Sequence, residues 1–125
     1  MEITQPTSHP KSILCVDDDT DTCELLDFLF DEYEFVSAHS VEKAFGLIES
    51  RQFDLYIFDN WLPDGSGIEL CRKVRESGFH TPIIFVSGAA QTEDVREAIG
   101  NGANKYLTKP CEPDLLQKVV KELIS

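Results

Sequence analysis

The chain has 125 residues, of which 42% are hydrophobic and 27% charged, a composition typical of one globular domain and too short for two. Its 11 Lys and Arg residues against 23 Asp and Glu residues leave a formal net charge of −12 at pH 7. That charge repels phosphate backbones and anionic lipid, which argues against nucleic-acid or membrane binding by the chain itself. The hydrophobic content also argues against a disordered acidic chain.

Cysteine spacing and the N-terminal segment favour a reducing compartment. The four cysteines are Cys15, Cys23, Cys71 and Cys111. None belongs to a CxxC pair, so reduced, partly buried thiols are favoured over a metal or redox site. No apolar run reaches the ~18 residues of a membrane span, and the polar residues 1–11 lack the apolar core of a signal peptide. We expect a cytoplasmic protein with a flexible arm over residues 1–11 and a folded domain over 12–125.

Short apolar runs, each followed by an amphipathic stretch, predict alternating strands and helices. The expected strands are 13–16, 35–38, 55–58, 82–86 and 106–108. Runs that are apolar throughout are typical of strands buried on both faces, as in a parallel sheet with helices on both sides. The pattern therefore predicts a doubly wound α/β fold of the (βα)5 type, a five-stranded parallel sheet with right-handed crossovers.

Capping residues place the starts of the intervening helices. Ser40 is predicted to cap the second helix, and Ser66 with Glu69 has the spacing of a capping box before the third. Thr92 is predicted to cap the fourth helix, and Pro113 to lie in the first turn of the fifth. The apolar sides of the first and fourth helices are expected to carry Leu25, Leu26, Phe28 and Leu29, and Val95, Ala98 and Ile99.

Polar side chains follow several of the predicted strands. They are Asp17, Asp18, Asp59, Ser87 and Lys109. The carboxyl ends of parallel strands meet at one edge of the sheet, where doubly wound folds bind ligands. Three neighbouring carboxylates repel one another, and a hard divalent cation such as Mg²⁺ relieves that repulsion. A lysine and a hydroxyl nearby can hydrogen-bond an oxyanion, so the set indicates a phosphoryl-transfer site with an aspartate as acceptor.

Four motifs resemble those of response-regulator receiver domains of two-component signalling. In chain order they are Val16-Asp17-Asp18, Asp59-x-x-Leu62-Pro63-Asp64-Gly65, Ser87-Gly88 and Lys109-Pro110. The resemblance covers residues 12–124, so the folded domain is identified as a receiver domain. It implies a flavodoxin-like sheet with strand order 2-1-3-4-5. It also implies a phosphoacceptor switch that takes part in its own phosphorylation and dephosphorylation and does not turn over a separate substrate.

The resemblance implies a role for each carboxylate. Asp59 would accept a phosphoryl group from the phosphohistidine of a sensor histidine kinase or from a phosphotransfer protein. Mg²⁺ would be held by Asp17, Asp18 and Asp59 together with the backbone carbonyl of Trp61.

The remaining site residues would respond to the phosphoryl group. By the same resemblance, Lys109 would pair with it, Ser87 would swing toward it, and Tyr106 would turn inward in step. The phosphoryl dianion would then shift a pre-existing equilibrium between inactive and active conformations. The alternative is a receiver-fold interaction module that works without phosphorylation.

Some residues depart from the family pattern. Trp61 is bulky and Ala89 offers no side chain to orient water, which predicts slow self-dephosphorylation; alternatively, Trp61 is an exposed aromatic that contacts a partner. Cys111 is interpreted as a tolerated small apolar residue in preference to a redox group. The histidines, none of which we assign to the site, are His9, His39 and His80.

Output and rival functions follow from the same motifs. We expect an unknown downstream protein target, contacted around the fourth helix, fifth strand and fifth helix, and consider a phosphorylation-dependent homodimer. An EF-hand loop beginning at Asp17 fails because Thr22 and Phe28 replace its glycine and glutamate. A DxDx[TV] phosphatase motif fails at Asp21. The sequence is compatible both with a stand-alone regulator and with a segment of a longer one.

Overall fold

Five parallel strands form the central sheet, in the order β2-β1-β3-β6-β7. The computed structural model describes residues 10–124, so most of the arm predicted over residues 1–11 lies outside the described residues. The strands of the sheet are β1 (Ser12–Val16), β2 (Glu34–Ala38), β3 (Leu55–Phe58), β6 (Ile83–Ser87) and β7 (Lys105–Thr108). Counted along the chain, these strands have the predicted order 2-1-3-4-5, and the flavodoxin-like fold is confirmed.

A small hairpin lies outside this sheet. Its strands, β4 (Trp61–Leu62) and β5 (Gly65–Ser66), pair antiparallel, with Trp61 opposite Ser66. The sequence analysis predicted only a turn in this segment, because its proline and glycine residues mask a pairing of two residues on each side.

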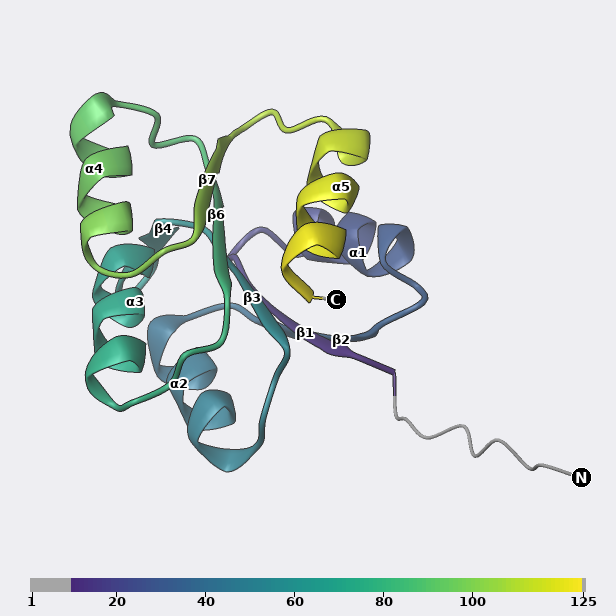
Figure 1. The fold of residues 1–125 in the computed structure, drawn as a ribbon, viewed down its shortest axis with the longest axis horizontal. Coiled ribbons are helices and arrows are strands. Elements are labelled where there is room, and N and C mark those ends of the chain that lie inside the picture. The colour runs from purple at the N-terminus through teal and green to yellow at the C-terminus, as the bar shows by residue number, and fades with distance from the viewer. Residues whose placement is uncertain (1–9, 125) are drawn as a thin grey trace, which may run out of the picture.

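Helices cover both faces of the sheet (Figure 1). On one face lie α1 (Thr20–Leu29) and α5 (Pro113–Ile124). On the other lie α2 (Val41–Ser50), α3 (Gly67–Glu76) and α4 (Thr92–Gly100). Alternate side chains of each strand point to opposite faces, so the sheet separates two cores. In β1, Ile13 and Cys15 join the α1/α5 core, whereas Leu14 and Val16 join the other.

The helix starts agree with the predicted caps except at α4. The Ser40 hydroxyl accepts the Lys43 N–H, and the Ser66 hydroxyl accepts the Glu69 N–H at 3.1 Å. At α4 the preceding residue is Gln91, so the prediction that Thr92 caps this helix is wrong. The reason is that the Asp94 carboxylate reaches back to the Gln91 N–H, which fixes the first turn one residue earlier.

The apolar side predicted for α1 is only partly buried. Leu26 is buried, but Leu25 is 64% exposed and Phe28 is 80% exposed; the core takes Cys23 and Phe30 instead. The sequence of this helix offers two overlapping apolar stripes, and packing against β1 and α5 selects the one that carries Cys23 and Leu26. Ile99 of α4 is likewise 46% exposed, contrary to its predicted burial.

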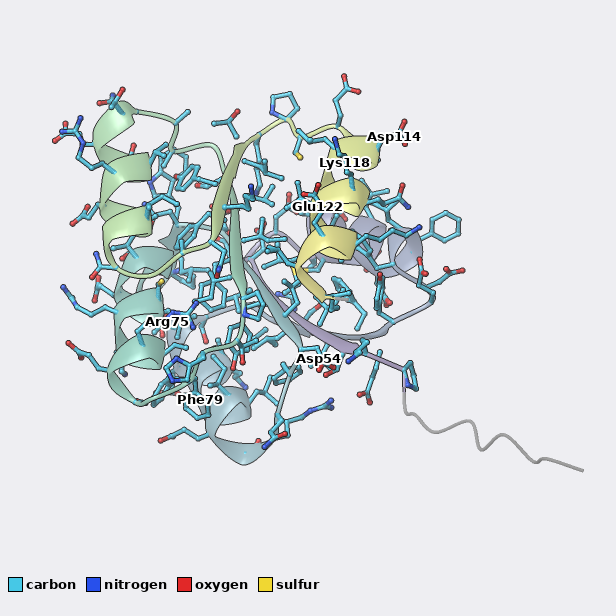
Figure 2. The ribbon with its side chains drawn as sticks, viewed as in Figure 1. Asp54, Arg75, Phe79, Asp114, Lys118 and Glu122 are labelled. Carbon is cyan, nitrogen blue, oxygen red and sulfur yellow. The ribbon has the colours of Figure 1, made fainter. Side chains whose placement is uncertain are left out.

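Arg75 fastens the end of the sheet opposite the carboxyl ends of the strands (Figure 2). Its guanidinium donates to the Gly102 carbonyl oxygen at 2.9 and 3.1 Å and to the Phe79 carbonyl oxygen at 3.0 Å. Gly102 has a φ of 108°, and a Cβ there would lie 2.7 Å from the Arg75 side chain, so the clamp requires glycine.

Within the described residues, no helix has both the length and the apolar character of a membrane span. Cys15, Cys23 and Cys71 are buried free cysteines and Cys111 is a partly exposed one, which agrees with the expectation of partly buried thiols.

Candidate functional site

The main chain holds Asp17 and Asp59 side by side at the carboxyl edge of the sheet. Asp17 follows β1 and donates its N–H to the Ala38 carbonyl at 3.1 Å; Asp59 follows β3 and donates its N–H to the Val16 carbonyl at 2.8 Å. Both residues therefore continue the hydrogen bonding of the sheet by one residue. They are 3% and 6% exposed, respectively. Their positions follow from the register of β1, β2 and β3 rather than from loop conformation.

Three carboxylates meet at this edge. Oxygen atoms of Asp17, Asp18 and Asp59 all lie within 4.8 Å of one another, and Asp18 is exposed whereas the other two are buried. Carboxylate oxygens with an open, solvated side suit a hard cation that keeps part of its water. The three residues thus fit a divalent cation such as Mg²⁺ by the chemistry of their donor atoms. The Trp61 carbonyl as a further ligand stays a prediction.

Lys109, which follows β7, neutralises part of this charge. Its Nζ donates to Asp17 Oδ2 at 2.9 Å and to Asp59 Oδ2 at 3.1 Å. Burial works to lower the pKa of Lys109, but the hydrogen bonds and charges of the two aspartates outweigh it and raise that pKa. Burial raises the pKa of Asp17, an effect that the hydrogen bond from Lys109 only partly opposes. In the absence of a cation, Lys109 is the positive charge bonded to both buried carboxylates.

Ser87 ends β6 and is fully buried. Its Oγ accepts the Ala89 N–H at 3.1 Å and the Asn60 N–H at 3.4 Å. The Ser87 backbone carbonyl accepts the Lys109 backbone N–H at 2.9 Å, so the main chains of these two residues are hydrogen-bonded to each other. The sequence analysis placed both at this edge, and the structure brings them together with Asp59.

Asn60 and Gly67 were missed by the sequence analysis. Asn60 is 7% exposed. Its side-chain Oδ1 accepts the Ile68 N–H at 3.1 Å, and its backbone carbonyl oxygen accepts the Gly67 N–H at 2.9 Å. A Cβ on Gly67 would lie 2.3 Å from the Asp59 carbonyl oxygen and 2.9 Å from the Phe85 ring. Together they pin the residue after Asp59 to the start of α3. The sequence did offer a signal for Asn60, because this polar residue directly follows Asp59 at the end of a predicted strand.

Trp61 lies beside the carboxylates and in solvent at once. Trp61 is 63% exposed, and its backbone N–H donates to Asp59 Oδ1 at 3.4 Å. The indole ring approaches Gly88, where an added Cβ would be 3.4 Å from Cζ3. Both interpretations of Trp61 from the sequence are therefore compatible with its position: it is exposed, and it flanks the site.

Tyr106 is already packed inward in this structure. Its ring stacks on Phe85 with centroids 5.4 Å apart and an interplanar angle of 3°. Its hydroxyl donates to the Ala89 carbonyl, in the loop that follows Ser87. Burial is the main cause that raises the pKa of the Tyr106 hydroxyl.

His39 and Cys23 touch the site from the far side of Asp17. His39 Nδ1 donates to the Asp17 carbonyl oxygen at 2.9 Å, and the Cys23 thiol donates to the same oxygen at 3.5 Å. The hydrogen bond from His39 to the Asp17 carbonyl is the main cause that raises the pKa of His39. The sequence analysis assigned no histidine to the site, and it did not foresee that His39 contacts the main chain of Asp17. The missed signal was that His39 directly follows the second strand.

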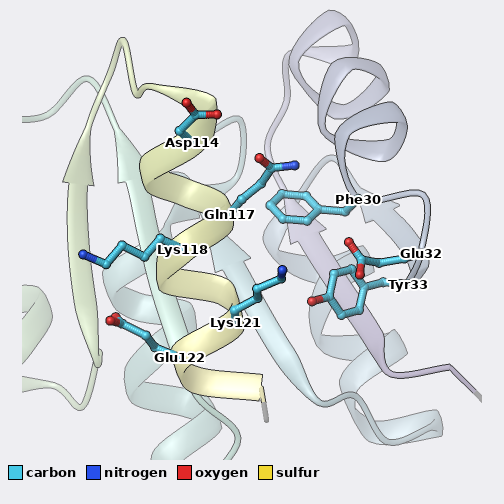
Figure 3. Close-up of a pocket in the computed structure, with 8 residues that line it drawn as sticks. All are labelled: Phe30, Glu32, Tyr33, Asp114, Gln117, Lys118, Lys121 and Glu122. Atoms are coloured by element: carbon cyan, nitrogen blue, oxygen red, sulfur yellow. The ribbon is translucent and has the colours of Figure 1, made fainter.

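Two grooves lie between α1 and α5, away from the three carboxylates. A cavity of about 510 Å³ separates α5 from the segment after α1; Figure 3 shows Gln117 and Lys121 projecting from α5 toward Phe30 and Tyr33. An apolar groove of about 480 Å³ lies nearer the site, and Lys109 lines one end of it. The charged groups converge at the carboxyl edge of the sheet, and of the two grooves only the apolar one includes a residue of that cluster, Lys109.

Comparisons with known proteins agree with this geometry. The family model described as response regulator receiver domain matches residues 13–121. The chain is 39% identical over 114 residues to an uncharacterized 14.6 kDa protein of Leptolyngbya boryana, which covers 88% of this chain and 87% of that protein. It is 36% identical over 110 residues to the transcriptional regulatory protein DltR of Streptococcus agalactiae serotype III (strain NEM316), covering 83% of this chain.

The match to DltR covers 47% of that protein, so the chain spans about half the length of this transcriptional regulator. Among solved structures, the CheY-like response regulator receiver domain protein of Methanospirillum hungatei JF-1 superimposes with a TM-score of 0.85. It is 35% identical, and the superposition covers 92% of this chain and 94% of that one.

Proposed function

The chain belongs to the response regulator receiver domain family, and on this premise we propose that it is a phosphoacceptor switch with Asp59 as the acceptor. Receiver domains are signalling switches and not turnover enzymes, and they interact with histidine kinases or phosphotransfer proteins. One observation carries the proposal: Lys109 bonds both buried aspartates, with Asp18 beside them. A salt bridge that served only to stabilise the fold would need Lys109 and one aspartate, not a cluster of three carboxylates.

In the proposed transfer, the Asp59 carboxylate attacks the phosphorus of a phosphohistidine. The new bond joins an Asp59 oxygen to phosphorus, the P–N bond breaks, and the imidazole of the donor leaves. The Lys109 ammonium, already 3.1 Å from Asp59 Oδ2, moves its hydrogen bond to a phosphoryl oxygen. Mg²⁺ held by Asp17, Asp18 and Asp59 would supply positive charge that offsets the repulsion between carboxylate and phosphoryl group.

The loop that follows β6 would transmit the change. Ala89 donates its N–H to Ser87 Oγ and accepts the Tyr106 hydroxyl on its carbonyl. A Ser87 hydroxyl that turns to the phosphoryl group must release the Ala89 N–H, so this loop would rearrange around a Tyr106 side chain that is already packed inward. The surface of α4, β7 and α5 would then change, and we propose it as the output face for a downstream target or a phosphorylation-dependent homodimer.

The kinase or phosphotransfer partner needs a surface that borders Asp59. Leu25, Phe28 and Leu115 are 64%, 80% and 45% exposed, and the apolar groove between α1 and α5 reaches Lys109. Of these three side chains, Leu25 lines that groove, and an exposed apolar surface of this kind is typical of an interaction site. We propose this face as the docking surface, and a cytoplasmic location follows from such a partner.

The test is intact-mass measurement after incubation with acetyl phosphate and Mg²⁺. A single phosphoryl adduct is expected in the wild type and in Asp31→Asn, which removes one exposed acid as a matched control. The adduct should be absent from Asp59→Asn and strongly reduced when Mg²⁺ is chelated. An unmodified wild type would instead support the phosphorylation-independent interaction module, and steady turnover of many phosphoesters would favour a hydrolase.

A further inference from the structure

The Asp17 carbonyl oxygen accepts two side-chain hydrogen bonds. The donors are the Cys23 thiol at 3.5 Å and His39 Nδ1 at 2.9 Å, and the sulfur lies 3.9 Å from that nitrogen. They come from α1 and from the residue after β2, respectively. Because they hold the main chain of Asp17, they help to position its carboxylate, which itself accepts the Asp19 N–H and the Lys109 ammonium, each at 2.9 Å.

Cys23 is one of the residues that line a cavity open to solvent. Its volume is about 170 Å³, and its lining residues are Thr20, Cys23, Glu24, Asp27, Ser37 and His39. One water occupies about 30 Å³ in the liquid, so the space accepts a small organic group as well as water. Cys23 is only 4% exposed, yet it lines a cavity wall formed by polar side chains.

We propose that Cys23 is a modification site for small disulfides, and that a group attached there weakens divalent-cation binding by Asp17. The inference rests on the proposed function in one respect, namely that Asp17 helps to bind the cation whose affinity would change. The buried thiol, the cavity and the shared carbonyl are independent of it.

The modification is a thiol–disulfide exchange. The Cys23 sulfur attacks one sulfur of the reagent, the S–S bond of the reagent breaks, and a new S–S bond joins Cys23 to half of it. The other half leaves as a thiol and takes the proton that Cys23 loses. A second thiol reverses the reaction, so the site can be restored by a reductant.

The exchange removes the only hydrogen that the Cys23 sulfur can donate to Asp17. The added group would lie in the cavity that His39 also lines, and because the sulfur is 3.9 Å from His39 Nδ1 we expect the second donor to shift as well. Partners that orient a metal ligand typically change affinity by roughly 10–100-fold when removed. Since one of the two donors is a weak S–H group, we expect about a tenfold loss of Mg²⁺ affinity.

The experiment uses the full chain with Cys111→Ser, which removes the partly exposed thiol, and 2-hydroxyethyl disulfide as the probe. Peptide mapping by mass spectrometry follows labelling of Cys23 and Cys71 in the same sample. Cys71 is the matched control, because it is fully buried and its thiol also donates to a carbonyl, that of Asn101 at 3.4 Å. Mg²⁺ affinity is read from the fluorescence of Trp61, the single tryptophan, before labelling, after it, and after reduction.

Cys23 should be labelled at least about ten times faster than Cys71, with weaker Mg²⁺ binding that a reductant restores. The Mg²⁺ affinity of Cys23→Ser should be insensitive to the probe. This variant should also bind Mg²⁺ more tightly than Cys23→Val, because the serine hydroxyl can still donate to the Asp17 carbonyl and valine cannot. Equal labelling of both cysteines, or a labelled protein with unchanged Mg²⁺ affinity, overturns the proposal. Failure of the unlabelled protein to bind Mg²⁺ refutes instead the proposed function and the coupling to it, whereas the labelling rates still decide the modification site.

Discussion

Replacing Asp59 with asparagine is expected to raise the melting temperature in metal-free buffer. The Asp59 carboxylate lies 3.1 Å from the Lys109 ammonium, and at an effective dielectric constant of about 20 this attraction contributes about 5 kcal/mol. An oxygen of Asp17 lies within 4.8 Å of one of Asp59, and the repulsion at that distance is about 3.5 kcal/mol. Burying the carboxylate adds a desolvation penalty of several kcal/mol. The attraction does not offset both.

The balance leaves the Asp59 carboxylate unfavourable by about 1–3 kcal/mol, which corresponds to a rise of about 3–10 °C on substitution in a domain of this size. The assay is thermal unfolding followed by circular dichroism in a chelating buffer, with Asp31→Asn as the control for a general loss of negative charge. Mg²⁺ at about ten times its Kd should stabilise the wild type by about 1.4 kcal/mol and the Asp59→Asn variant by less. A melting temperature of Asp59→Asn at or below that of Asp31→Asn would refute the clustering argument.

Three further predictions follow from single contacts. Gly67→Ala should destabilise the protein by about 1–3 kcal/mol, because its Cβ would meet the Asp59 carbonyl, whereas Gly46→Ala, with open space around it, should stabilise by about 0.5–1 kcal/mol in urea unfolding. The raised pKa of His39 means that its contribution to stability is complete below the ordinary histidine pKa of about 6.5 and is lost as pH rises through the folded-state pKa. Urea midpoints at pH 6 and 8 should therefore differ more for the wild type than for His39→Asn, and equal differences would contradict the bond to Asp17. Trp61→Asn should shorten the lifetime of the phosphoryl adduct by about tenfold if the indole keeps water from the site, as measured by decay of intact mass; a longer lifetime would exclude that role.

The fold could be predicted because the three central strands, β1, β3 and β6, are almost wholly apolar and buried on both faces. That pattern is produced only when helices cover both sides of a parallel sheet, and strand ends then follow from where the apolar runs stop. The hairpin of β4 and β5 and the cap of α4 could not be predicted in the same way. Each depends on one or two hydrogen bonds, such as that from the Gln91 N–H to Asp94, which compete with equally plausible neighbours.

The burial of α1 shows where pattern reasoning fails. Leu25 and Phe28 are as apolar as Leu26, so hydrophobicity alone assigns all of them to the core. The structure buries Leu26 with Cys23 and leaves Phe28 in solvent. A helix has several faces, and only its tilt against β1 and α5 decides which one is covered. An exposed phenylalanine on this helix is then informative about partners rather than about packing.

The sequence by itself determined which residues stand at the carboxyl ends of the strands, because that depends only on where each apolar run ends. It thereby placed Asp17, Asp59 and Lys109 at one edge. The tertiary structure decided which atoms meet there: Lys109 bridges two carboxylates, and the Asp17 carbonyl receives His39 and Cys23. Those contacts join residues from different strands and helices, whose relative positions are set by sheet register and helix packing and leave no local trace in the chain.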